Sequence, residues 1–200
     1  MMQPQIIGIT GGIGCGKSAL CNYFSQLGYP VIDTDQVAKA LVKPGQPGLV
    51  AIIEALGKDY LLQNGELNRD KLRQTFFNNP QIKQQVEAQI HPLVRQYVAQ
   101  QIELLRPKHR LIFIAIPVIH QLNQPEYQLD YVLLVECDAE KQLERVQQRD
   151  GRTPEQIHAI MQNQATPEQR QARADGIIYN NTDLNSLHQQ AYAWLQKMLA

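Results

Sequence analysis

The sequence predicts an α/β fold in which helices cover a doubly wound parallel sheet. Two apolar runs, residues 111–116 and 131–135, do not alternate with polar residues, which is typical of central parallel strands buried on both faces. A third short strand is predicted at residues 5–10, directly before a glycine-rich loop and a helical pattern. Helical segments separate these runs, and that order favours parallel pairing.

The remaining elements of the core follow in chain order. A helix is expected from residue 19 to residue 27, where Gly28 ends it. Shorter strands are predicted at residues 31–32 and 177–179, and a further helix at residues 139–149. Residues 154–174 form a polar helical stretch with few apolar side chains. We expect this stretch to be weakly anchored and to act as a mobile lid, at about residues 150–174.

Residues 35–107 carry helical patterns without a strong strand. Helices are predicted at residues 37–42, 49–56, 69–77 and 82–105, with turn signals at residues 44–48 and 64–65. We interpret this part as a helical insertion. It divides a nucleotide-binding core made of residues 1–34 and 108–200.

Composition excludes several classes of protein. The 200 residues include 19 Lys and Arg against 19 Asp and Glu, so the chain lacks the strong positive charge of proteins that bind nucleic acid or anionic membranes. No apolar run approaches the roughly 20 residues that span a bilayer, and no signal peptide is evident, so we expect a cytoplasmic protein. The three cysteines have no metal-ligand spacing, and we expect neither zinc nor a disulfide.

Residues 11–18 match the phosphate-binding pattern G-x-x-x-x-G-K-[ST] in full. The backbone of such a loop surrounds a polyphosphate, and its position between a strand and a helix directs amide groups at the anion. Lys17 would reach the β and γ phosphates, and the Ser18 hydroxyl would bind Mg²⁺. The alternative is an ordinary glycine-rich turn. The predicted ATP-binding residues of the loop are Gly11, Gly12, Ile13, Gly14, Cys15, Gly16, Lys17 and Ser18.

The rest of the sequence narrows the kind of nucleotide protein. A guanine-reading Asn-Lys-x-Asp motif is absent from the sequence, which argues against a GTPase. The strand at residues 131–135 continues into Glu136, so a switch-like ATPase, with an acidic residue for Mg²⁺, stays open. A small-molecule kinase needs a carboxylate near the γ phosphate, an acceptor pocket and cations, and the chain has candidates for each.

Asp33 is the candidate catalytic base. Asp33 and Asp35 follow the short strand at residues 31–32, and residues just past a parallel strand lie at the ligand crevice of such sheets. The structural alternative is an N-cap of the next helix, and it fits Asp35 better than Asp33.

Arg145 and Arg149 lie four residues apart on a predicted helix, so they share one face and could bind an anion together. The alternative is a pair of solvated arginines balanced by Glu144 and Asp150. Arg170 and Arg173 have a weaker claim to such a role.

Taken together, these features resemble the dephospho-CoA kinase family over nearly the whole chain. The resemblance rests on residues 10–18, 28–35, 44–48, 65–73, 90–95 and 142–150, with Gln164, Arg170, Ala174, Asp175 and Asn180 near the end. It implies a P-loop kinase that uses ATP and Mg²⁺ to phosphorylate the ribose 3′-hydroxyl of dephospho-CoA. It implies no nucleic-acid, membrane or obligate protein partner.

The resemblance also assigns roles to individual residues. Asp33 matches the family's proposed base. Lys17, Arg145 and Arg149 complete the set of predicted catalytic residues. Acceptor contacts are implied for Asp33 together with Arg69, His91 and Arg95, and the segment ending at Asn180 resembles the part that lies against adenine. For His91, a helix N-cap or a packed core histidine is the alternative.

One segment departs from the family pattern. After the strand at residues 111–116 the family shows an acidic residue, whereas this chain reads Pro117, Val118, Ile119, His120 and Gln121. Two competing functions share most of the other features. They are a nucleoside or nucleotide monophosphate kinase and a nucleotide-binding switch protein without a small acceptor.

Overall fold

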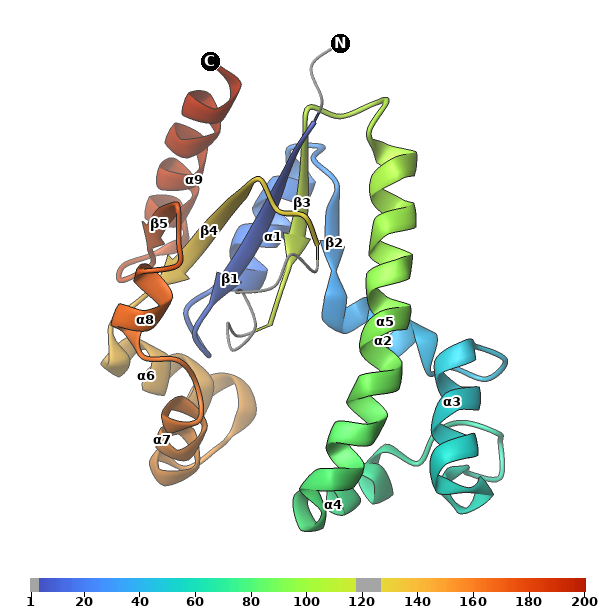
Figure 1. Cartoon of the computed structure of the whole chain (residues 1–200). Coiled ribbons are helices and arrows are strands. Elements are labelled where there is room, and N and C mark those ends of the chain that lie inside the picture. Colours follow the sequence, from blue (N-terminus) through green and yellow to red (C-terminus); the bar gives the residue numbers. More distant parts are fainter. Residues whose placement is uncertain (1–3, 118–126) are drawn as a thin grey trace. The chain divides into compact units, whose positions relative to one another are not determined.

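The computed structural model describes residues 4–117 and 127–200 of the chain (Figure 1). These residues form two compact units. Unit 1 comprises the described residues of Met1–Ile32 and Leu104–Ala200, and unit 2 comprises Asp33–Glu103.

A five-stranded sheet with helices forms unit 1, which confirms the predicted α/β class. The strand order is β2-β3-β1-β4-β5. The central strand β1 pairs in parallel with β3 and β4, and β4 pairs in parallel with β5. The strands are β1 (Gln5–Gly11), β2 (Val31–Asp33), β3 (Leu111–Ala115), β4 (Tyr131–Glu136) and β5 (Gly176–Tyr179).

Five helices belong to this unit within the described ranges: α1 (Lys17–Gln26), α6 (Ala139–Asp150), α7 (Pro154–Gln162), α8 (Pro167–Gln171) and α9 (Leu184–Leu199). Helices α1 and α9 contact each other (Figure 1). Phe24 of α1 stacks on Phe113 of β3, with ring centroids 4.3 Å apart, and Leu187 and Leu195 of α9 complete this core. Helix α9 was not predicted, although its buried residues recur every four positions.

Unit 2, Asp33–Glu103, is helical. It contains α2 (Thr34–Leu41), α3 (Pro47–Leu56), a 3₁₀ helix (Lys58–Tyr60), α4 (Arg69–Asn78) and most of α5 (Pro80–Leu105). Helix α5 continues through Pro92, and its buried stripe is Val86, Ile90, Val94, Val98 and Ile102. Helices α2 and α3 approach closely because position 48 is glycine. A Cβ there would lie 2.7 Å from Leu41 O.

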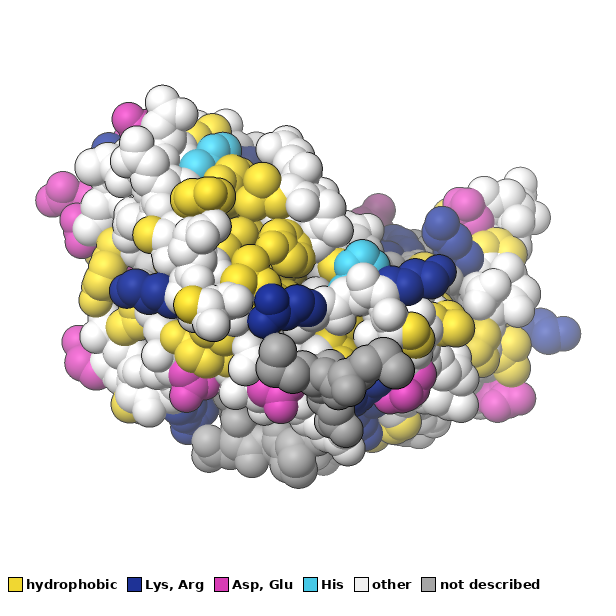
Figure 2. All heavy atoms as spheres, turned by 90° about the horizontal axis from the view of Figure 1, so that it is seen from above, with side chains coloured by type: hydrophobic (Ala, Val, Ile, Leu, Met, Phe, Trp, Pro, Cys, Tyr) yellow, Lys and Arg dark blue, Asp and Glu magenta, His cyan; other side chains and the backbone are white. Residues whose placement is uncertain are grey.

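The surface carries charges of both signs. Figure 2 shows acidic and basic side chains interspersed over the face that it views, in keeping with zero net charge. Among the described helices, none combines the length and the apolar character that a membrane span requires.

Candidate functional site

The glycine-rich loop connects the central strand to a helix. Strand β1 ends at Gly11, and α1 begins at Lys17 after Gly16, its N-cap. Gly14 and Gly16 have φ angles of 75° and 101°, a left-handed conformation that residues with a Cβ atom rarely adopt. The first amides of α1 have no partner within the helix. Together with the positive end of the helix dipole, they make this end of the loop suited to a phosphate.

Glycine is also required where the loop packs against β4 and α6. A Cβ on Gly11 would lie 2.5 Å from Val135 O, and one on Gly12 2.5 Å from Gln142 Nε2. A Cβ on Gly14 would lie 3.0 Å from Gln142 O. We expected Gly12 and Gly14 to clear space for phosphates. The structure adds that they let the loop lie directly against α6.

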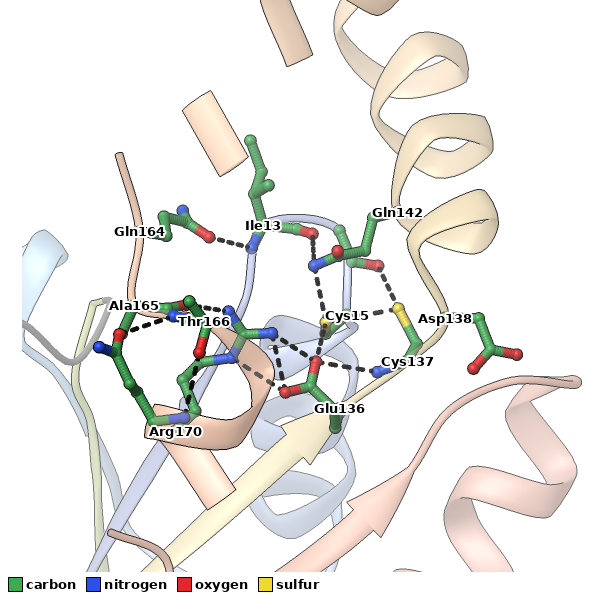
Figure 3. A network of polar contacts seen from close by, with 12 residues as sticks. Ile13, Cys15, Glu136, Cys137, Asp138, Gln142, Gln164, Ala165, Thr166 and Arg170 are labelled. Carbon is green, nitrogen blue, oxygen red and sulfur yellow. Dashed lines mark hydrogen bonds and ion pairs between the residues drawn. The ribbon is translucent and has the colours of Figure 1, made fainter. Parts of the chain in front are cut away.

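Two glutamines hold the tip of the loop (Figure 3). Gln142 of α6 donates a hydrogen bond from Nε2 to Ile13 O at 2.9 Å. The Ile13 amide donates to Gln164 Oε1 at 3.1 Å. Neither role is predictable from the sequence, because glutamine is scattered along the chain and a distant partner leaves no local signal.

Glu136 is committed to a buried ion pair with Arg170. Arg170 Nε donates to Oε2 and Nη2 to Oε1, each at 2.9 Å, while Nη1 donates to Ala165 O (Figure 3). The Cys137 amide and Cys15 Sγ lie 3.2 and 3.3 Å from Oε1. This carboxylate is therefore poorly placed to hold Mg²⁺, which argues against the switch-like ATPase.

The same ion pair corrects an expectation about the segment at residues 154–174. We expected it to be weakly anchored because its apolar content is low. Arg170 instead fastens α8 to the end of β4, and Ile157 and Ala165 are buried as well. A buried polar anchor of this kind does not appear in a count of apolar residues.

Asn180 lies behind the loop. Its Nδ2 donates to Cys15 O at 2.8 Å, and its Oδ1 accepts a hydrogen bond from Arg145 Nη2 at 3.3 Å. The buried Nη1 of Arg145 has no hydrogen-bond partner among the described residues. The Nη1 amino group of Arg145 therefore has no acceptor within residues 4–117 and 127–200, although burial makes such a group costly to leave unpaired.

Arg149 does not join Arg145. It forms an exposed bidentate pair with its neighbour Asp150, at 2.7 and 2.8 Å, and these hydrogen bonds lower the pKa of Asp150. Glu144 pairs with Lys141. For Arg149 the structure thus matches the alternative in which the arginine is solvated and neutralised by Asp150.

Asp33 is the N-cap of α2. Its Oδ1 accepts hydrogen bonds from the amides of Asp35 and Gln36, at 2.9 and 3.1 Å. The expectation that Asp35 suits the cap better was wrong, because α2 begins at Thr34, two residues earlier than such a cap requires. Within the described ranges Asp33 Oδ2 has no hydrogen bond, so one carboxylate oxygen stays available.

The predicted acceptor residues lie in unit 2. Arg69 is the first residue of α4, and its Nη2 donates to Lys39 O at 3.4 Å. His91 and Arg95 are both half-buried and one turn apart on α5. His91 is not an N-cap, because α5 begins eleven residues before it, at Pro80. The departure from the family pattern at residues 118–121 lies outside the described residues.

Lys17 and Ser18 open α1. Lys17 is half-buried and Ser18 exposed, and in the part of the chain that the structure describes neither side chain has a hydrogen bond or an ion pair. That part also contains no cluster of three or more His, Cys, Asp or Glu side chains for a metal ion. A hydroxyl such as Ser18 fits Mg²⁺, which commonly takes few protein ligands and the rest from substrate phosphates and water.

A parallel sheet whose central strand enters this loop and then a helix, with a helical unit inserted after β2, defines a P-loop kinase. A family model for dephospho-CoA kinase matches residues 5–186. A dephospho-CoA kinase from Hydrogenovibrio crunogenus is 40% identical over 192 residues, which cover 96% of each chain. The chain belongs to the dephospho-CoA kinase family.

Solved structures agree with this assignment. TT1252 from Thermus thermophilus matches with a TM-score of 0.81 and 30% identity over 98% of each chain. Dephospho-CoA kinase from Campylobacter jejuni matches with a TM-score of 0.74 and 25% identity over 96% of each chain. The relatives are therefore similar in fold along the full length, including the helical insertion.

Proposed function

We propose that this chain transfers the γ-phosphoryl group of ATP to the ribose 3′-hydroxyl of dephospho-CoA, the last step of coenzyme A biosynthesis. The observation that carries the proposal is the family match over residues 5–186, on a chain whose loop keeps every residue of the phosphate-binding pattern. The products are CoA and ADP.

In this proposal the loop holds the triphosphate of ATP. Amides at the start of α1 face the phosphates, and the Lys17 ammonium neutralises charge on the group being transferred. Ser18 would hold Mg²⁺, which shields the phosphate oxygens when bound. The support is that Lys17 and Ser18 have no partner within the described residues, so binding ATP breaks no ion pair of either side chain.

Asp33 is proposed as the base that accepts the proton of the 3′-hydroxyl. The two cap hydrogen bonds fix its Oδ1, which orients the carboxylate without using Oδ2. Asp33 is also the last residue of β2, and the carboxyl ends of parallel strands form the ligand crevice in doubly wound sheets. A base held in this way loses little orientational freedom when the acceptor binds.

Arg69, His91 and Arg95 are proposed to contact the acceptor. Dephospho-CoA carries a diphosphate, and guanidinium groups suit phosphate because each presents two parallel N–H donors. His91 and Arg95, one turn apart on α5, can reach the same ligand.

Arg145 and Asn180 are proposed to serve the ATP side. The unpartnered Nη1 of Arg145 can donate to a phosphate oxygen without breaking an existing hydrogen bond. Arg149 is proposed to bind ATP phosphate as well, after it releases Asp150. Its exposed position permits this change. Asn180 supports the loop through Cys15 O.

We also propose a cytoplasmic location, since the three cysteines are thiols, the form that a reducing compartment maintains.

An acceptor panel tests the proposal. The purified chain is given ATP and Mg²⁺ with dephospho-CoA, with each nucleoside monophosphate, or with water alone, and ADP release is measured. We expect fast release with dephospho-CoA and only background release otherwise. Faster release with a nucleoside monophosphate would identify a nucleotide kinase, and equal release with water an ATPase; either result would contradict the proposal.

A further inference from the structure

Two cysteines lie side by side directly behind the phosphate-binding loop (Figure 3). Cys15 Sγ is 3.4 Å from Cys137 Sγ, and the two side chains are not joined in a disulfide. Cys15 belongs to the loop after β1, and Cys137 follows the last residue of the neighbouring strand β4. The proposed phosphoryl transfer uses neither sulfur atom.

The surroundings of the two sulfur atoms make them chemically different. Their shared hydrogen bond lowers the pKa of Cys137, and the charge of Arg145 adds to this effect, although burial opposes it. The same hydrogen bond and burial raise the pKa of Cys15. The thiolate is the form that reacts with oxidants. Cys137 is also 7% exposed against 0% for Cys15, so an oxidant meets Cys137 first.

We propose that Cys15 and Cys137 form a redox site, in which a peroxide oxidises the two thiols to a disulfide that closes the loop to ATP. This regulation rests on the proposed function, in which the loop is the ATP site. The bond joins the residue between Gly14 and Gly16 to the end of the adjacent strand.

The reaction balances with hydrogen peroxide as the oxidant. The Cys137 thiolate attacks one peroxide oxygen, an S–O bond forms, the O–O bond breaks, and hydroxide leaves and takes a proton. Cys15 sulfur then attacks the Cys137 sulfenic acid, so that the S–S bond forms, the S–O bond breaks and water departs. Glu136 Oε1, 3.3 Å from Cys15 Sγ, is placed to accept the thiol proton and pass it to the leaving hydroxide. Two thiols lose two electrons, and one peroxide becomes two waters.

Disulfide formation requires the two sulfur atoms to move closer together. A disulfide bond is about 2.0 Å long, so the sulfur atoms must approach by roughly 1.4 Å from their present 3.4 Å. The loop has little slack, since Cys15 O accepts from Asn180 and its flanking glycines have left-handed backbone angles. In our proposal, closing the gap pulls Cys15 towards β4 and turns the adjacent amides, which are the ones offered to phosphate.

The covalent part is tested without any substrate. The full reduced chain is treated with hydrogen peroxide, and the product is analysed by intact mass and peptide mapping. We expect a species two hydrogen atoms lighter, with the Cys15 and Cys137 peptides joined. Cys21→Ala is the matched control and should form the same link, whereas Cys137→Ala should not. Oxidation of single cysteines to sulfinic acid without the link, or a disulfide that uses Cys21, would overturn the proposal.

The functional part is tested by ATP binding, measured calorimetrically on reduced and oxidised protein. Oxidation should weaken ATP binding by at least about tenfold, and dithiothreitol should restore it. The ATP affinity of each variant after oxidation is compared with that of its own reduced form. In Cys137→Ala, peroxide should not change the ATP affinity. If Cys137→Ala fails to fold, Cys15→Ser is used in its place. Unchanged ATP affinity in the linked protein would overturn the regulation. Failure of the proposed function gives a different result. In that case the chain does not phosphorylate dephospho-CoA, but the disulfide still forms and still weakens ATP binding.

Discussion

Arg170 and Glu136 join α8 to the end of β4 through two parallel hydrogen bonds of 2.9 Å. The two side chains are 4% and 5% exposed, so the pair is almost completely removed from water. Glu136 Oε1 also lies within 3.3 Å of Cys15 in the phosphate-binding loop. One carboxylate thus connects the segment at residues 154–174 with the loop that receives ATP in our proposal.

Glu136→Gln should lower the free energy of unfolding by about 3 to 5 kcal/mol, because it leaves the Arg170 charge buried without a counter-charge. Urea unfolding at neutral pH measures the change. Arg149→Gln is the matched control, since Arg149 makes the same bidentate contact with Asp150 but is 62% exposed. That variant should lose no more than about 1 kcal/mol. Equal losses would show that burial of the Glu136 pair is unimportant.

Alkylation of Cys137 should begin at a lower pH in the folded chain than in the unfolded chain. The hydrogen bond with Cys15 lowers the pKa of Cys137. The thiolate therefore forms at a lower pH than in an ordinary cysteine, and it is lost as the pH falls through this lowered pKa. Iodoacetamide labelling across a pH series, with peptide mass spectrometry, gives the midpoint. Cys15→Ala should raise that midpoint and Cys21→Ala should not. A folded midpoint at or above the unfolded one would refute the assignment.

Lys17→Ala should reduce kcat by at least about a hundredfold, because phosphoryl transfer depends mostly on positioning and charge. Steady-state assays with ATP and dephospho-CoA measure the loss, and circular dichroism checks that the fold is intact. Lys141→Ala is the control, since this exposed lysine pairs with Glu144 on α6. Turnover near that of the wild type in Lys17→Ala would rule out the loop as the catalytic site.

Asp33→Asn separates the two roles of Asp33. Asparagine caps a helix as well as aspartate does, so the free energy of unfolding should stay within about 0.5 kcal/mol, whereas Asp33→Ala should lose about 1 kcal/mol. Both variants should bind ATP yet lose at least about a hundredfold in kcat, since neither can accept the proton. Calorimetry, urea unfolding and turnover are compared on the same preparations. Retained turnover in Asp33→Asn would mean that another group is the base.

The fold was largely predictable because its signals are local. The apolar runs at residues 111–116 and 131–135 became β3 and β4, and the pattern at residues 82–105 became most of α5 despite Pro92. Helix α9 was missed although Leu187 and Leu195 keep helical spacing. The Asp33 cap was misassigned because a shift of two residues in the start of α2 changes which side chain reaches the free amides.

Much of the site depends on residues far apart in sequence. Glu136 and Arg170 are 34 positions apart, and their pairing follows from where α8 lies against β4, which no local pattern encodes. The contacts of Gln142 and Gln164 with Ile13 are of the same kind. The motif predicts which loop binds phosphate, but the side chains that hold this loop in place are determined by tertiary packing.

The position of the new phosphate on the product shows directly whether this chain phosphorylates the ribose 3′-hydroxyl of dephospho-CoA. The chain is incubated with ATP, Mg²⁺ and dephospho-CoA, and the isolated product is examined by phosphorus NMR with coupling to the ribose protons. We expect a phosphomonoester coupled to the 3′ proton, formed in equal amount with ADP. A phosphate on another hydroxyl, or ADP without a phosphorylated acceptor, would contradict it.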